Sequence, residues 1–306
     1  MKTPFHTDHH PEIGVVEALR PGLQVVTAPN AGPMTFTGTR SYLLGDREVA
    51  VIDPGPKDAA HLAALERALE GRRLGHIIVT HAHIDHSPLA AVLSARTGAP
   101  VYGFGPANAG RSKVMERLAA AAPLGGGEGI DADFTPDITV PDGGLIRGEG
   151  WTLEAIHTPG HLSNHLCFAW QGQGALFSGD HVMGWASTLV SPPDGDLTAF
   201  MASLRKLQRR PEDTYYCGHG AVLEGAHDML DYLLAHRLER EGQIRAALAR
   251  APQTVAELTQ QMYRDVDPRL HGAAARNVLA HLVDLYERGI VAPLGDFSAT
   301  ARFRLT

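Results

Sequence analysis

Cysteine is scarce in this chain of 306 residues, which contains only Cys167 and Cys217. So few cysteines in so long a chain argue against a disulfide framework. Long apolar runs are missing too, since no stretch approaches the ~20 residues that a membrane-spanning helix needs. The N-terminus is polar and lacks the apolar core of a signal peptide. We therefore expect a cytoplasmic protein that does not interact with membranes.

Positive charge and aromatic side chains are also in short supply. The net charge is -7 and aromatic residues make up 6% of the chain. No general basic field would attract nucleic acid, and stacking platforms for single-stranded bases are not evident. The hydrophobic fraction of 44% still allows one large domain or two unequal ones with a full core.

Histidine is abundant, and several histidines occur in patterns typical of metal ligands. The densest pattern is the string THAHIDH at residues 80–86, which directly follows an apolar run at residues 76–79. His161 follows TPG, Asp180 follows FSG, and His219 follows CG. Imidazole and carboxylate ligands suit zinc, iron or manganese, and a bound metal can turn water into hydroxide near neutral pH. The sequence therefore predicts a metal-dependent hydrolase.

Most of the chain alternates predicted strands with predicted helices. Short apolar or β-branched runs predict strands at residues 23–28, 41–44, 49–52, 76–79, 101–104, 151–156, 165–170, 175–177 and 214–217. Apolar residues at helical spacing predict helices at residues 57–70, 88–96, 111–121, 197–208 and 227–248, and residues 122–133 are expected to form a loop. Each candidate ligand segment follows a predicted strand. Because strand ends share common edges, the loops there can bring distant ligands together.

The spacing of the candidates suggests a site for two ions. Seven residues divide into two sets of three and one bridging residue, namely His81, His83 and His161, then Asp85, His86 and His219, and finally Asp180. Two ions roughly 3.5–4 Å apart would hold a shared hydroxide that attacks a carbonyl or phosphoryl centre. Asp85 would orient this nucleophile and shuttle a proton. The alternative is a chain that keeps the fold but binds no metal.

The C-terminal part has a different character. Helices are expected at residues 254–263 and 273–288, followed by strands at 290–293 and 301–305, which with the preceding helix is the order of a winged helix. We expect a hydrolase domain at residues 1–235 and a winged helix at 236–306. Residues 241–306 contain eight arginines and seven acidic residues, a poor match for phosphate contacts. A DNA-binding regulator is thus the weaker alternative to a domain that covers the site or forms a homodimer.

These motifs resemble the metallo-β-lactamase-fold superfamily over about residues 20–235. The resemblance implies an α/β fold, an αββα sandwich with the metals at one edge of its paired sheets, and the ligand set given above. Asp53, in VIDPG, matches an early Asp that supports the metal site by hydrogen bonding in this family. The His and Asp ligand set is similar to that of glyoxalase II and of the family's nucleases and thioesterases.

The resemblance also narrows the expected activity. The best-known lactam-cleaving enzymes have Cys where this chain has Asp180, which disfavours a β-lactamase. The added winged helix and the segments at residues 178–184 and 236–241 resemble the lactamase-beta-2-like group. This group includes endoribonucleases acting on single-stranded RNA and thioesterases. Because neither part of the chain is basic, we expect a small ester or thioester substrate ahead of RNA.

Three further residues are candidates for supporting the ligands or contacting substrate, namely Asn164, His165 and His181. The family commonly has Gly-Gly soon after the histidine string, whereas this chain has Ser87-Pro88-Leu89, a difference in a turn and not in a ligand. The predicted cofactors are two divalent ions, zinc first, with iron and manganese as alternatives.

Overall fold

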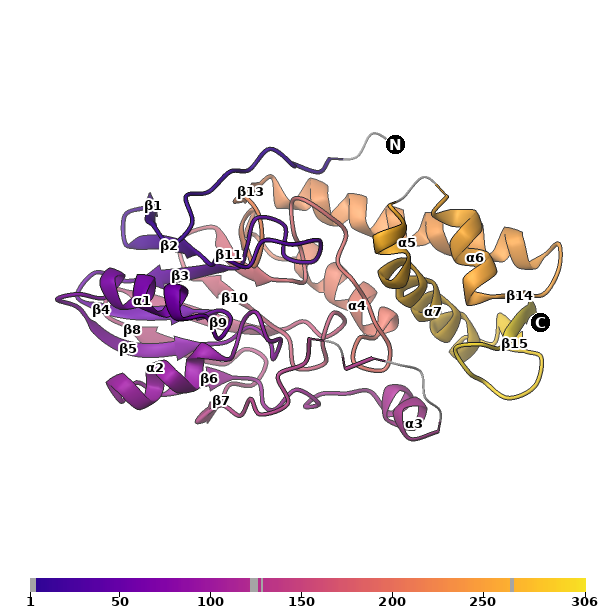
Figure 1. Cartoon of the computed structure of the whole chain (residues 1–306), viewed down its shortest axis with the longest axis horizontal. Helices are drawn as coiled ribbons and strands as arrows, with labels where there is room; N and C mark the ends of the chain where they lie inside the picture. The colour runs from indigo at the N-terminus through magenta and orange to yellow at the C-terminus, as the bar shows by residue number, and fades with distance from the viewer. Residues whose placement is uncertain (1–3, 122–125, 128, 265–266) are drawn as a thin grey trace.

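The computed structural model describes residues 4–121, 126–127, 129–264 and 267–306. Two β-sheets stack face to face, helices cover their outer faces, and a smaller helical unit lies at one end (Figure 1). This is the predicted αββα sandwich with a winged helix. Residues 122–125 and 128, part of the loop expected at 122–133, lie outside the described residues.

The first sheet has seven strands that follow the order of the chain. They are β1 (Val16–Arg20), β2 (Leu23–Thr27), β3 (Arg40–Leu44), β4 (Glu48–Ile52), β5 (Arg73–Ile78), β6 (Val101–Gly103) and β7 (Ile138–Thr139). Strands β1 to β4 pair antiparallel, and β4 to β7 pair parallel. The parallel pairs require crossover connections, and two of these contain α1 (Ala59–Ala68) and α2 (Leu89–Thr97).

The second sheet has six strands in the order β13-β12-β11-β10-β9-β8. They are β8 (Leu145–Gly148), β9 (Trp151–His157), β10 (Leu166–Trp170), β11 (Ala175–Gly179), β12 (Thr214–Cys217) and β13 (Leu223–Glu224). Only β11 and β12 pair parallel, and α4 (Leu197–Gln208) lies in the connection between them. Asp196 begins this helix by accepting a hydrogen bond from the backbone N–H of Ala199.

Alternating side chains of the strands build separate apolar layers. Tyr42 of β3 points between the sheets and belongs to the same buried cluster as Phe168 and Phe177. Leu43, the next residue, packs on the outer side with Leu65 of α1. Because both faces of each sheet are covered, the strand ends are held in fixed positions.

The winged helix begins within a long helix that the hydrolase domain shares. It contains α5 (Ala226–Leu248), β14 (Gln253–Thr254), α6 (Val255–Met262), a 3₁₀ turn (Pro268–Leu270), α7 (His271–Glu287), β15 (Val291–Pro293) and β16 (Arg302–Leu305). A capping box between Thr254 and Glu257 begins α6. Met115 and Leu118 of α3 (Lys113–Ala121) join the apolar core of this unit. The predicted boundary between residues 235 and 236 falls inside α5 and stays a prediction.

Sequence patterns missed five short or weakly buried strands, namely β1, β7, β8, β13 and β14. None of the five residues of β1 is fully buried, so its sequence lacks the alternation that indicates a half-buried strand. The helices of the described part of the chain include none with the length and apolar composition to cross a membrane.

Candidate metal centre

The candidate ligands meet at one edge of the paired sheets. His81 follows β5, His161 follows β9, Asp180 follows β11 and His219 follows β12. The first of these strands belongs to one sheet and the other three belong to the other. The structure thus brings together side chains that are up to 138 residues apart in the sequence, as the strand-end pattern predicted.

Three imidazoles converge in a first cluster, formed by His81, His83 and His161. The Nδ1 atom of His83 lies 2.9 Å from Nε2 of His81 and 3.0 Å from Nε2 of His161. The ring nitrogens of this set are close enough to bind one ion. Such a set of nitrogen lone pairs is the donor chemistry that zinc and similar ions take in proteins.

A second cluster contains Asp85, His86 and His219. The Oδ2 atom of Asp85 lies 3.2 Å from Nε2 of His219 and 3.4 Å from Nε2 of His86. The two Nε2 atoms are 3.3 Å apart. These atoms are also close enough to bind one ion. The division of the ligands between two ions stays a prediction, because Asp53, His81 and His86 also lie close enough together to bind one ion.

Asp180 lies between the two clusters. Its Oδ2 atom is 3.3 Å from Nε2 of His219 and 3.7 Å from Nε2 of His161. Its Oδ1 atom is buried and lies 3.4 Å from Nε2 of His86. A Cβ atom at Gly218 would lie 2.3 Å from this oxygen, so only glycine leaves room for the carboxylate. A buried carboxylate oxygen that lies beside candidate ligand nitrogens in such a cradle fits a cation.

The ring nitrogens that point away from the clusters are held by the surrounding chain. Nδ1 of His161 donates to the carbonyl of Leu189 at 2.8 Å. Nδ1 of His219 lies 3.3 Å from the carbonyl oxygen of Gly38. These carbonyls can accept a proton from the outer nitrogen of each ring, so the inner nitrogen is the one directed at a metal. No sequence pattern marks these acceptors, because they are backbone atoms.

Asp53, which the resemblance implies supports the metal site by hydrogen bonding, lies directly behind His86. Its Oδ2 atom is 2.9 Å from Nδ1 of His86, and its two oxygens accept hydrogen bonds of 2.7 Å from the backbone and the hydroxyl of Thr80. The same hydroxyl lies 2.9 Å from Nδ1 of His81. Asp53 therefore contacts the second cluster directly and reaches the first through Thr80, a role that the sequence analysis did not assign to Thr80.

Burial keeps the first cluster neutral. Burial and the neighbouring His161 lower the pKa of His83 to about 3. Burial also lowers the pKa values of His81 and His161. Because neutral imidazole is the form that binds metals, this cluster has no proton to lose near neutral pH.

Carboxylates give the second cluster the opposite character. Burial lowers the pKa of His219, but Asp180 and Asp85 outweigh it and raise that pKa to about 9. Asp85 and Asp180 likewise outweigh burial at His86, whose pKa lies well above its ordinary value. Burial raises the carboxyl pKa values of Asp85 and Asp180, but the two histidines hold them well below their usual range. The cluster thus favours positive charge between its carboxylates.

The three remaining candidates lie behind the ligands. Asn164 accepts a hydrogen bond from the backbone of Ala82 at 3.3 Å and donates to Gly105 at 2.9 Å. His165 accepts at Nε2 from the backbone of Asp180 at 3.3 Å. His181 is fully buried beside Phe200, with ring centroids 4.6 Å apart. Their burial favours a supporting role over contact with substrate.

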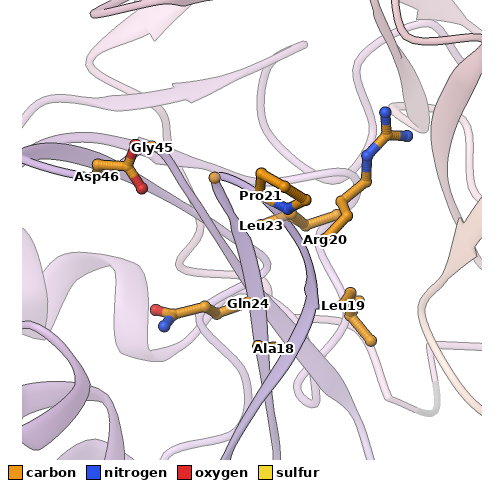
Figure 2. A pocket seen from close by; sticks show the side chains of 9 residues that line it. Ala18, Leu19, Arg20, Pro21, Leu23, Gln24, Gly45 and Asp46 are labelled. Carbon is orange, nitrogen blue, oxygen red and sulfur yellow. The ribbon is translucent and has the colours of Figure 1, made fainter.

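A hollow elsewhere on the first sheet is separate from this site. It has a volume of about 430 Å³ and is lined by Arg20, Gln24, Gly45 and Asp46, among others (Figure 2). Gly45 follows the end of β3, whereas Thr39, before the start of β3, lies 3.4 Å from Asp85. The hollow and the ligand clusters therefore lie at opposite ends of that strand.

Comparisons with known proteins identify the family of each domain. Residues 34–219 match the model of the metallo-beta-lactamase superfamily, and residues 254–300 match the beta-lactamase associated winged helix domain. A beta-lactamase-like protein 2 homolog of Caenorhabditis elegans is 29% identical over 285 residues, covering 90% of this chain and 88% of that protein. An atrochrysone carboxyl ACP thioesterase of Aspergillus fumigatus is 31% identical over 244 residues, covering 78% of this chain and 68% of that protein.

A solved structure shares the fold over almost the whole chain. A beta-lactamase domain protein from Burkholderia ambifaria matches with a TM-score of 0.80 and 21% identity, covering 98% of this chain and 96% of that one. The superfamily model itself matches more than half of the sequence. This chain therefore belongs to the metallo-beta-lactamase superfamily of hydrolases and carries its associated winged helix domain.

Proposed function

We propose that this chain is a thioesterase that uses two divalent metal ions, with zinc as the first candidate and iron or manganese as alternatives. The observation that carries the proposal is the pair of clusters with Asp180 between them. His81, His83 and His161 would hold one ion, and Asp85, His86 and His219 the other. When bound, such ions supply activated water and neutralise the charge that develops on the attacked carbonyl.

The protein residues contribute orientation and proton transfer. Asp85 is the more exposed of the two carboxylates, with 21% of its side chain accessible against 8% for Asp180. Its Oδ2 atom also accepts a hydrogen bond of 3.4 Å from the hydroxyl of Thr39. From this position Asp85 would orient the attacking water and carry its proton to the departing thiolate.

The choice of a thioester depends on the relatives and on charge. The names of several relatives state that they act on carrier-bound thioesters, including the Aspergillus fumigatus protein described above. The chain also carries a net charge of -7, which opposes binding of a long polyanion. RNA is therefore the less favoured substrate.

A role in DNA binding is opposed by the position of α7. Helices that read DNA insert exposed side chains into the major groove. Here Arg276 and Asn277 of α7 instead hydrogen bond to Ser191 and Val190 of the hydrolase domain. These two side chains of α7 are therefore bound by the same chain, which supports a structural role for this domain.

Thiol release from a panel of acyl-coenzyme A, acyl-pantetheine and acyl-glutathione thioesters would test the proposal. We expect release that stops with a chelator and returns when zinc is added. Asp85→Asn should lower turnover by about 100-fold or more, since general acid–base groups contribute 10²–10⁴-fold. Wild-type turnover in this variant would contradict the role of Asp85. If protein with two bound ions releases no thiol but cleaves short single-stranded RNA, the thioester proposal is wrong.

A further inference from the structure

The segment of residues 188–192 runs between the metal clusters and the winged helix, and we call it the strap. It lies between β11 and α4 and has no regular secondary structure. Val190 is fully buried in the core cluster that includes Leu204 of α4 and Leu230 of α5. The strap is thus packed inside the molecule and in a position to connect the two domains.

One side of the strap supports the ligands. The carbonyl of Leu189 accepts the hydrogen bond from Nδ1 of His161. The hydroxyl of Thr188 donates to the carbonyls of Asp180 and His181 at 2.8 and 3.0 Å. A shift of the strap would therefore turn the His161 ring, because a single bond to Leu189 fixes its outer nitrogen.

The other side of the strap is held by three side chains, one from α5 and two from α7. Asn277 accepts at Oδ1 from the backbone N–H of Val190 at 3.1 Å and from Nη1 of Arg237 at 3.0 Å. Nη2 of Arg237 donates to the carbonyl of Thr188. Arg276 adds hydrogen bonds to the Ser191 hydroxyl, at 2.7 Å, and to the Pro192 carbonyl.

The burial of Arg237 is costly and therefore informative. Its exposed fraction is 2%, and no Asp or Glu among the described residues forms an ion pair with it. Its guanidinium instead lies over the Phe200 ring, 5.3 Å from the centroid. A buried cation without a counter-charge normally destabilises a fold. An apolar residue of similar length would fill this space at lower cost, so the hydrogen bonds to the strap are the feature that an arginine provides.

We propose that Arg237 and Asn277 are positioning residues for His161, and that the winged helix thereby sets the affinity of the first cluster for its metal ion. They fix the strap, the strap fixes the Leu189 carbonyl, and this carbonyl orients the imidazole. The inference rests on the proposed metal-binding role of the clusters. It does not depend on which substrate is hydrolysed.

The test is a stepwise cobalt(II) titration of the whole protein against a competing chelator, followed by absorption. Wild-type protein should show two binding steps. Asn277→Leu removes the acceptor at similar volume and should weaken one step about 10–100-fold, the range seen when partners of metal ligands are removed. Asn277→Asp keeps the acceptor and should retain wild-type affinity. Arg237→Met should behave like Asn277→Leu.

Two further variants identify the affected step. Asp53→Asn acts on His86 and should weaken the other step. Arg288→Gln is the matched control, because Arg288 pairs with Glu241 and Asp284 inside the winged helix and does not contact the strap. Equal affinities in Asn277→Leu and wild type, or equal weakening of both steps, would overturn the positioning role. If wild-type protein bound no cobalt at all, both the positioning role and the proposed metal-binding role of the clusters would be wrong.

Discussion

The two ligand clusters lie side by side, yet they differ in charge and in how the chain supports them. The first contains three imidazoles that burial keeps neutral, with the pKa of His83 at about 3. In the second, carboxylates raise the pKa of His219 to about 9. A metal ion entering the first cluster displaces no proton near neutral pH, whereas one entering the second must displace protons. We therefore expect the first cluster to fill first.

Asp180→Asn should have the largest effect, because this carboxylate is shared by both clusters. The substitution keeps the shape of the side chain and removes its charge. We expect fewer than two ions per chain and a fall in thiol release of more than about 100-fold, comparable with the loss of a main electrostatic group. Metal analysis after gel filtration and the thioester assay would measure both. Asp142→Asn, which alters an exposed pair with Lys206, is the control.

Gly218→Ala should affect the second cluster more than the first. The new Cβ atom would lie 2.3 Å from Oδ1 of Asp180 and 2.8 Å from Cε1 of His86, so these side chains must move. We expect the second ion to be lost while the first remains. Gly242→Ala is the matched control, since its Cβ atom would meet nothing within 4 Å and alanine stabilises a helix by about 0.5–1 kcal/mol. Two tightly bound ions in Gly218→Ala would contradict the assigned geometry.

Sequence patterns could single out the seven candidate ligands because the expected chemistry is carried by side chains that follow recognisable strands. The string at residues 80–86 and the residues after β9, β11 and β12 required only the assumption that strand ends share an edge. Asp53 came from the family resemblance, and the structure places it behind His86. The winged helix was predictable from the order of its helices and strands, whereas the layers of the sandwich came from the family resemblance.

The interactions that hold the candidate ligands in place could not be predicted from sequence patterns. The carbonyls of Leu189 and Gly38 belong to the backbone, and any residue type would supply the same acceptor. Nothing in the local sequence of their helices distinguishes Arg237 and Asn277, and only the fold brings them into contact with each other and with the strap. Their roles depend on contacts between the two domains, which local sequence patterns do not contain.

Asp53→Asn should have a smaller effect that is restricted to the second cluster. The amide keeps an acceptor but loses the charge that fixes the outer nitrogen of His86 at 2.9 Å. We expect affinity for the second ion to fall about 10–100-fold while the first ion is held as before. Cobalt titration resolves the two steps. Weakening of both steps would mean that Asp53 acts mainly through Thr80, which contacts His81 as well.

The smallest expected effect is on the protonation states of the metal-free protein, which test the charge difference between the two clusters directly. His219 has a raised pKa of about 9, so its contribution to stability is complete below pH 6.5 and is lost as the pH rises through 9. His83 has a pKa lowered to about 3, so its contribution is present above pH 6.5 and is lost as the pH falls toward 3. Imidazole NMR of chelator-treated protein should show His219 charged and His83 neutral at pH 7. Both rings neutral at that pH would remove the charge difference, and with it the reason for the first cluster to bind its ion first.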